Sequence, residues 1–386
     1  MSKVVTKDEV KSAINDVEVA LGSVSGAVAS IDSKPSRNLI DRWFSNRTVE
    51  TDTDNERVYL GLLNHLVQVY KNSDCVKSDR TNTGTYSDFG PQCVYDLRKG
   101  FPLLTTKAMR FKSIWIELIW FLKGDTRLDF LHKFGVHIWD EWANAEGDLG
   151  PIYGEMWRDW GDGHIDQIGN LLHMLKRDPD SRRMIVTGWD PDLLPKSGDS
   201  FSRNVSQGKQ ALPPCHTMWQ VYTSLRPVAE VRDRLMSSPD INTSSVPPIE
   251  KVSEIYRLAE ECSIPIRYLD LKLYQRSGDV FLGVPYNVAS YSLLMLVLCT
   301  ITGYLPRYFI HTFGDVHLYS NHVEQAMLQL SRTPKPSPVV TLNDSALLST
   351  SVIPNLSLDF FLDNPETSLL LLNYKSHPSI PAPVAV

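Results

Sequence analysis

Segments with helical spacing of apolar residues and segments with strand-like composition follow each other along this chain without a regular βαβ alternation. Apolar residues recur every three or four positions in 56–70 and in 165–177, which predicts two amphipathic helices. Runs rich in Val, Ile, Tyr and Trp at 184–188, 216–223 and 268–275 predict strands. This order of segments predicts an α+β fold around a mostly mixed sheet.

Two further segments are apolar enough to be helices buried in a core. Residues 112–122 (KSIWIELIWFL) are apolar nearly all round, and a long apolar helix is predicted from Val288 to Thr302. The most apolar run of this second helix, Leu293 to Ile301, is too short to span a bilayer. The N-terminus, MSKVVTKDEVKSAIND, lacks the apolar core of a signal peptide. We therefore expect no membrane partner.

The chain is predicted to contain an N-terminal extension, residues 1–55, and a main domain, residues 56–386. The extension is polar and rich in Ser, Asp and Val without a strong period, which is compatible with a short helical extension or a partly disordered tail. Within the main domain, residues 225–266 are rich in Pro, Ser and charged residues. They predict a surface insertion with one helix at 249–261.

Charge and cysteine content narrow the possible ligands. The net charge of −6 argues against a non-specific nucleic-acid binder, so an anionic ligand must be held by a local cluster of arginines. Five cysteines at scattered spacings fit neither a disulfide framework nor a zinc site, and we expect no metal. Free thiols predict a reducing compartment, the cytoplasm.

One cysteine has an unusual sequence context. Cys215, in ALPPCHTMWQVY, follows two prolines and precedes a histidine. Proline fixes its own φ and restricts the residue before it, so the backbone is held in place here. A nucleophile that must be aimed needs such a backbone, but a buried structural role is the commoner explanation of a lone cysteine. The context alone leaves both interpretations open.

A second segment, YQRSGDVFLGVPYN, concentrates polar groups in an apolar frame. Arg276, Ser277, Asp279 and Asn287 lie within twelve residues, and alternation places them on one side of a strand–turn unit. An isolated Asp or Asn in a turn is usually a local cap or turn-former. Four polar groups together also fit a ligand site.

Tryptophans and one carboxylate form a third group of candidates. Residues 138–160 contain four of the nine tryptophans of the chain, which fit either core packing or a wall on which a flat heterocycle stacks: Trp139, Trp142, Trp157 and Trp160. Glu117 lies inside WIELIWF, where a buried carboxylate is unfavourable unless it has a task or a partner.

These segments together resemble the thymidylate synthase family. The resemblance runs from about Glu56 to the C-terminus, with 225–266 out of pattern and 1–55 outside it, and rests on DRTNTGT, GFPLLTTK, WFLKGDT, IWDEW, GDLGPIYG, DPDSRR, LPPCH, YQRSGDVFLG, PYN, GDVHLYSNH and the terminal APVAV. It implies a three-layer α+β fold whose mixed sheet forms the interface of an obligate homodimer.

The resemblance implies a covalent reaction with deoxyuridine monophosphate (dUMP). Cys215 resembles the nucleophile that adds to C6 of dUMP, and the guanidinium of Arg276 is expected to lower the pKa of its thiol. Planar guanidiniums suit a phosphate dianion. The phosphate ligands implied are Arg80, Arg276 and Ser277, with Arg182 and Arg183 from the other subunit. Without the resemblance, Arg182 and Arg183 would indicate only a solvated helix end.

Further residues are implied to bind the base and sugar. Asn287 resembles the residue that reads O4 and N3–H of uracil, because its amide both donates and accepts. Residues His317 and Tyr319 resemble the ligands of the 3′-hydroxyl, although alone they would suggest core residues with satisfied hydrogen bonds. Glu117 resembles the carboxylate that moves protons at O4 through ordered water. Near the sulfur, the resemblance places Tyr153 and His216.

The resemblance also implies a reduced folate, 5,10-methylenetetrahydrofolate, as co-substrate. Its stacking wall would comprise Ile138, Trp139, Trp142, Leu212, Gly283 and Tyr286. Asp279 resembles the pterin-binding carboxylate, and Val386 resembles the end of a tail that closes over the site. Two departures lie near this cavity: Tyr286 stands where the family usually has Phe, and GWDP (188–191) replaces Ala-Trp-Asn-Pro.

Two reactions share this site. Hydride from tetrahydrofolate yields dTMP and dihydrofolate, whereas water yields 5-hydroxymethyl-dUMP and tetrahydrofolate, as in phage deoxypyrimidine-monophosphate hydroxymethylases. Trp139, Tyr153 and the APVAV tail favour the synthase because they suit a dry site, and Tyr286 favours the hydroxymethylase because its hydroxyl can hold water. A non-catalytic binding module of the same fold is disfavoured, since every catalytic position is filled. A phage-encoded chain would act in the host cytoplasm.

Overall fold

The computed structural model describes residues 54–72, 76–79, 81–343 and 356–384. The predictions made for residues 1–53, for Arg80 and for Val386 lie outside these ranges. The division at residue 55 and the interpretation of 225–266 as an insertion stay predictions.

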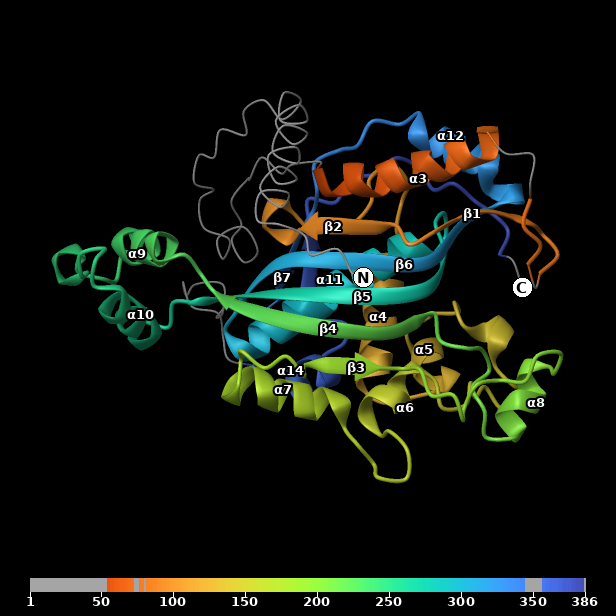
Figure 1. The fold of residues 1–386 in the computed structure, drawn as a ribbon, viewed down its shortest axis with the longest axis horizontal. Helices are drawn as coiled ribbons and strands as arrows, with labels where there is room; N and C mark the ends of the chain where they lie inside the picture. The colour runs from red at the N-terminus through yellow and green to blue at the C-terminus, as the bar shows by residue number, and fades with distance from the viewer. Residues whose placement is uncertain (1–53, 73–75, 80, 344–355, 385–386) are drawn as a thin grey trace, which may run out of the picture. The chain divides into compact units, whose positions relative to one another are not determined.

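A mixed sheet forms the centre of the fold (Figure 1). Its strand order is β1 (Thr85–Phe89), β6 (Leu305–Tyr319), β5 (Arg267–Asp279), β4 (His216–Leu225) and β3 (Ile185–Thr187), while β2 (Gln92–Asp96) also pairs with β6. Strands β5 and β6 are parallel, and the other pairs are antiparallel. The three predicted strands are confirmed as β3, β4 and β5, and the α+β class with a mixed sheet is confirmed with them.

The sheet and two buried helices form three successive layers. Helix α11 (Gly283–Thr302) packs against β5 and β6, and α4 (Phe111–Leu122) packs against α11. Helix α11 begins five residues before the predicted start because Pro285 falls in its first turn, where a proline is tolerated. It is long and apolar enough to cross a membrane, but 89% of its most apolar window is buried inside the protein, as in a core helix.

The remaining elements surround these layers. Helix α3 (Asp54–Asn72) contacts β1, β2 and α12, and β7 pairs with β8 in a separate small sheet. The bounds are α5 (Leu128–Lys133), the short 3-10 helix η3 (Asp140–Trp142), α6 (Tyr153–Arg158), α7 (Gln167–Arg177), α8 (Phe201–Ser206), α12 (Val323–Leu330), β7 (Val339–Leu342), α14 (Leu358–Asp363) and β8 (Leu369–Leu372).

The segment between β4 and β5 contains two α-helices, where the sequence predicted one. Helix α10 (Val252–Glu261) corresponds to the predicted helix, and α9 (Val228–Ser237) was not predicted. The two helices pack on each other around their own small apolar cluster, which includes Val231, Leu235 and Ile255.

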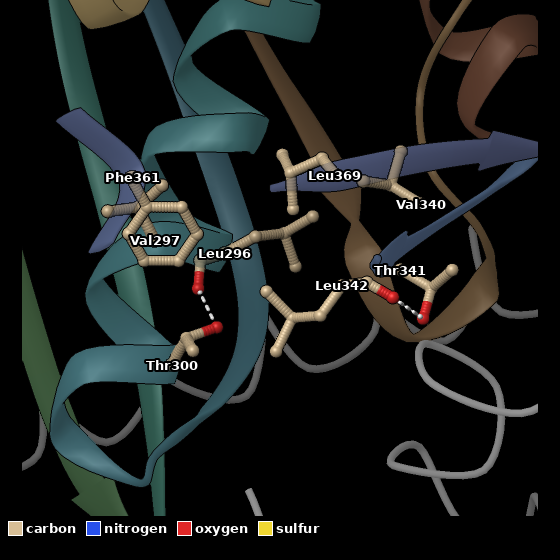
Figure 2. A pocket seen from close by; sticks show the side chains of 8 residues that line it. All are labelled: Leu296, Val297, Thr300, Val340, Thr341, Leu342, Phe361 and Leu369. Carbon is tan, nitrogen blue, oxygen red and sulfur yellow. Dashed lines mark hydrogen bonds between the residues drawn. The ribbon is translucent and has the colours of Figure 1, made fainter. Parts of the chain in front are cut away.

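A small apolar cavity lies between α11, α14 and the β7–β8 pair (Figure 2). The hydroxyl of Thr300 on its wall donates to the carbonyl of Leu296 (2.8 Å), and Phe361 and Leu369 add apolar surface. None of the residues proposed from the sequence for the site lines it, so we assign it to packing.

Candidate active site

The Cys215 loop, residues 211–215, is held by hydrogen bonds between its backbone and residues of two other elements. The N–H of Cys215 donates to the hydroxyl of Tyr153 on α6 (2.8 Å), and its carbonyl accepts from the N–H of Arg276 on β5 (2.9 Å). The guanidinium of Arg276 donates to the carbonyls of Pro213 (2.8 Å) and Pro214 (3.0 Å). The predicted fixed backbone therefore has partners on both sides of the sulfur.

The sulfur of Cys215 lies 3.7 Å from a guanidinium nitrogen of Arg276. Burial nevertheless raises the pKa of the Cys215 thiol, and the charge of Arg276 lowers it by less. The expected net lowering is thus absent from this structure, because burial penalises the thiolate more than one guanidinium stabilises it.

Glu117 on α4 has both a partner and a perturbed pKa. Its Oε1 accepts from Nε1 of Trp139 (2.7 Å). Burial raises the pKa of Glu117 to about 7, although the Trp139 hydrogen bond acts in the opposite direction. A carboxyl with this pKa exchanges protons readily near neutral pH, which is what general acid–base work requires.

A buried chain of polar side chains fixes Asn287. Its Oδ1 accepts from Nε2 of Gln275 (3.1 Å), and Oε1 of Gln275 pairs with Nε2 of His311 (2.8 Å). Asn287 also bonds to His216, and burial lowers the pKa of this histidine to about 4. His216 is therefore neutral at physiological pH, and its buried Nδ1 has no partner among the described residues.

The two arginines expected from another subunit lie far from the Cys215 of their own chain. Both are exposed, in the turn that leads into β3. The carbonyl of Met184 accepts from Val221 on β4, six residues beyond Cys215. At about 3.3 Å per strand residue, Arg182 and Arg183 lie roughly 20 Å along the sheet from the sulfur.

The two candidate sugar ligands lie at the end of β6, beside the end of β5. His317 is paired with Asp279 across the two strands, and its Nδ1 bonds to Asp315 (2.9 Å). The ring of Tyr319 meets that of His317 edge to face at 5.0 Å. Ser277 is the strand partner of Asp315, so the structure brings candidate phosphate and sugar ligands to one end of this strand pair.

A sequence model of the thymidylate synthase family matches residues 58–386. The chain belongs to the thymidylate synthase family. Membership implies dUMP and a reduced folate as substrates, with methylenetetrahydrofolate as the one-carbon donor.

Two of the residues expected to bind folate, Asp279 and Gly283, lie beside Asn287. Asp279 Oδ1 accepts from the N–H groups of Phe281 and Leu282, so this carboxylate is a turn-former as the simpler interpretation held. A Cβ on Gly283 would lie at ordinary contact distance from Asp279 Cβ (3.7 Å) and Asn287 Oδ1 (3.9 Å), so Gly283 lies beside both side chains.

The four tryptophans differ in burial, and Trp160 is only partly buried against the core. Trp157, 1% exposed, packs edge-on against Trp219 and is a core residue. Trp139 packs against Trp142 with ring centroids 5.8 Å apart. Other members of the expected folate wall are partly buried against the core, namely Ile138, Trp142, Leu212 and Tyr286.

Both departures from the thymidylate synthase pattern lie near expected catalytic groups. The hydroxyl of Tyr286 accepts a hydrogen bond from the backbone N–H of Arg110. Burial raises the pKa of Tyr286, and the negative charge of a Glu117 carboxylate raises it further. The N–H of Gly188 donates to the carbonyl of Thr217 (2.9 Å), and the guanidinium of Arg276 lies 5.8 Å from the ring of Trp189, so the GWDP segment lies beside the Cys215 loop.

His322, which the sequence did not single out, holds the tail. Its Nε2 bonds to the carbonyl of Pro383 (2.7 Å), and its ring packs at 5.6 Å from those of Phe281 and Tyr319. Gln275 was missed in the same way. Gln275 lies within the motif YQRSG and His322 within YSNH. Their place in these motifs was the one feature of the sequence that could have identified them.

Proposed function

We propose that this family member is a thymidylate synthase, which converts dUMP and 5,10-methylenetetrahydrofolate to dTMP and dihydrofolate. The observation that carries the proposal is the 2.7 Å hydrogen bond from Trp139 to Glu117. It anchors the indole in an aromatic group in which Tyr153 and Phe121 lie 6.1 and 6.3 Å away. Water kept out by such a wall cannot compete with hydride for the exocyclic methylene.

Cys215 begins the reaction by adding its sulfur to C6 of dUMP, and the displaced electron pair moves through C5 to O4. Arg276, 3.7 Å from the sulfur, favours the thiolate as it forms. Glu117 gives and takes a proton at O4 through ordered water, which its pKa of about 7 allows. Asn287 holds the base edge, with its amide oriented by Gln275.

Folate supplies the one-carbon unit. C5 of the nucleotide bonds to the methylene carbon as one of its two bonds to folate nitrogen breaks. C5 then loses its proton, the second carbon–nitrogen bond breaks, and the released tetrahydrofolate stays bound to donate hydride. Hydride transfer to the resulting methylene forms the methyl group, and Cys215 departs from C6 as the C5–C6 double bond returns. The nucleotide gains CH2, and the folate is oxidised to dihydrofolate.

The hydroxymethylase remains the second candidate because of Tyr286. A phenol hydroxyl both donates and accepts hydrogen bonds, so Tyr286, which is partly buried against the core, can hold a water molecule. Folate deuterated at its hydride-donating carbon separates the two reactions. The synthase puts deuterium into the product methyl group, and retention of all deuterium in the folate would support water addition.

We also propose a homodimer with shared phosphate sites in a reducing, cytoplasmic compartment. Arg182 and Arg183 need a second chain to reach a phosphate near Cys215, given their distance along β4. Apolar side chains on the outer face of β3–β5 are exposed and suit an interface: Ile185, Met218, Tyr222 and Tyr274.

Hybrid dimers test this arrangement. One site of a Cys215→Ala and Arg182→Ala heterodimer carries neither defect, so partial activity should return on mixing. A verified heterodimer without activity would argue that Arg182 acts in its own subunit or not at all.

A further inference from the structure

Two imidazoles and one carboxylate converge on the surface near η3. Asp140, the first residue of η3, bonds through Oδ1 to Nε2 of His132 on α5 (2.7 Å) and through Oδ2 to Nδ1 of His137 (2.9 Å). All three side chains are exposed. One potential ligand atom from each lies within 4.8 Å of the other two.

This donor set matches a divalent transition metal. Two imidazoles and a carboxylate are ligands that Zn²⁺ binds at about 2.0–2.2 Å, which places tetrahedral ligand atoms roughly 3.4 Å apart. His132 and His137 face different oxygens of Asp140, and one ligand atom from each residue lies within 4.8 Å of the other two, so the three atoms need shifts of about an ångström to reach this spacing. Each ring nitrogen that faces Asp140 must be free of its proton, which a neutral histidine can carry on its other nitrogen.

Contrary to the expectation of no metal, which rested on the cysteines alone, we propose that His132, His137 and Asp140 form a surface Zn²⁺ site next to the expected folate wall. Water completes the coordination, since the three side chains are open to solvent. The proposal does not depend on which reaction the chain catalyses.

Other histidine–aspartate pairs on the surface lack this arrangement. His164 bonds to Asp159 (2.7 Å) and His65 to Asp88 (2.7 Å), each with a single histidine. Among the described residues, no second group of three His, Cys, Asp or Glu ligands meets the same distance limit. In each of these pairs the aspartate orients one imidazole ring, whereas Asp140 orients the rings of both His132 and His137.

The proposed ion would restrain a segment that reaches the active site. Ile138 and Trp139 lie between His137 and Asp140, and Trp139 donates to Glu117. Coordination would join this segment to α5 through His132. Because the unfolded chain does not hold the three ligands together, zinc would bind the folded state selectively and raise its melting temperature.

Isothermal titration of the full chain with Zn²⁺ tests the site. The Cys215→Ala background removes the catalytic thiol as a competing ligand. In that background we expect one equivalent bound per chain and a higher melting temperature. His137→Gln should weaken binding by more than about tenfold, because one of three protein ligands is lost.

His164→Gln is the matched control, since it removes an exposed histidine that is also paired with an aspartate. It should leave Zn²⁺ affinity and the zinc-induced rise in melting temperature unchanged. No measurable binding, equal affinity in the parent and His137→Gln chains, or loss of binding in His164→Gln would each overturn the proposal.

Discussion

The Cys215 loop and the Trp139 segment are held in different ways. Cys215 is fixed through its own backbone N–H and carbonyl, with Tyr153 and Arg276 as partners. Trp139 is fixed through one side-chain hydrogen bond to Glu117 and through ring packing, and its neighbour Asp140 is exposed. The position of the nucleophile is thus set through its backbone by two elements, whereas Trp139 is held through its side chain. We infer that the first region determines whether reaction begins and the second how it ends.

The largest effect is expected at the nucleophile. Cys215→Ser should reduce turnover to background, because a serine hydroxyl is far less ionised than a thiol. Release of tritium from C5-labelled dUMP in the presence of folate measures this. Near-normal tritium release would show that Cys215 is not the nucleophile.

The second-largest effect is expected on the preference of the enzyme for one base over another. Asn287→Asp should shift preference from dUMP toward dCMP, because a protonated carboxyl can donate to N3 of cytosine while its other oxygen accepts from the N4 amine. Discrimination by buried polar groups reaches the order of 10⁴-fold. The ratio of kcat/KM for the two nucleotides is the readout. An unchanged ratio would show that Asn287 does not read the base.

Removing one support of the Cys215 loop should have an intermediate effect. Tyr153→Phe leaves the Cys215 N–H without its acceptor, which destabilises the fold by about 1–3 kcal/mol. The misplaced sulfur should lower kcat by roughly tenfold, since about 1.4 kcal/mol corresponds to that factor. Urea unfolding and steady-state kinetics check both numbers. Unchanged kcat would mean that Arg276 alone positions the loop.

The smallest effect concerns the pKa of Glu117. Trp139→Phe removes the hydrogen bond that opposes burial, so the pKa should rise further above about 7 and the corresponding limb of the pH–rate profile should move to higher pH. Glu117→Gln should abolish that limb. If Trp139→Phe leaves this limb of the pH–rate profile unchanged, the indole does not influence the pKa of Glu117.

The same carboxyl links pH to stability. Its folded pKa, about 7, exceeds its ordinary value of 4.5, so the folded chain binds more protons between these values. Its contribution to stability is therefore greatest at low pH and is lost as the pH rises toward 7. Urea unfolding of Glu117→Gln, measured at several pH values, should not show this loss of stability as the pH rises.

Much of the fold could be predicted because burial is reflected in local sequence patterns. Strands β3 to β5 follow the predicted runs of Val, Ile, Tyr and Trp, and helices α3 and α7 follow the predicted helical spacing of apolar residues. Strand β6 was missed because polar residues interrupt its pattern, and their partners lie on β5: His311 bonds to Gln275, and Arg307 to Asp270. No local period records a partner more than thirty residues away.

The same limit applies to the site. Cys215 and Asn287 were found through their motifs, but Gln275 and His322 owe their roles to His311 and Pro383, which only the fold brings near. The raised pKa of the Cys215 thiol depends on burial, which the sequence around it does not quantify.

Product mass and dihydrofolate absorbance, measured in one reaction, distinguish hydride from water in the last step. If hydride completes the reaction, the nucleotide is heavier than dUMP by CH2, with one dihydrofolate formed for each dUMP consumed. A nucleotide heavier by CH2O, with no dihydrofolate, would contradict hydride transfer and make Tyr286 the leading candidate for positioning the water.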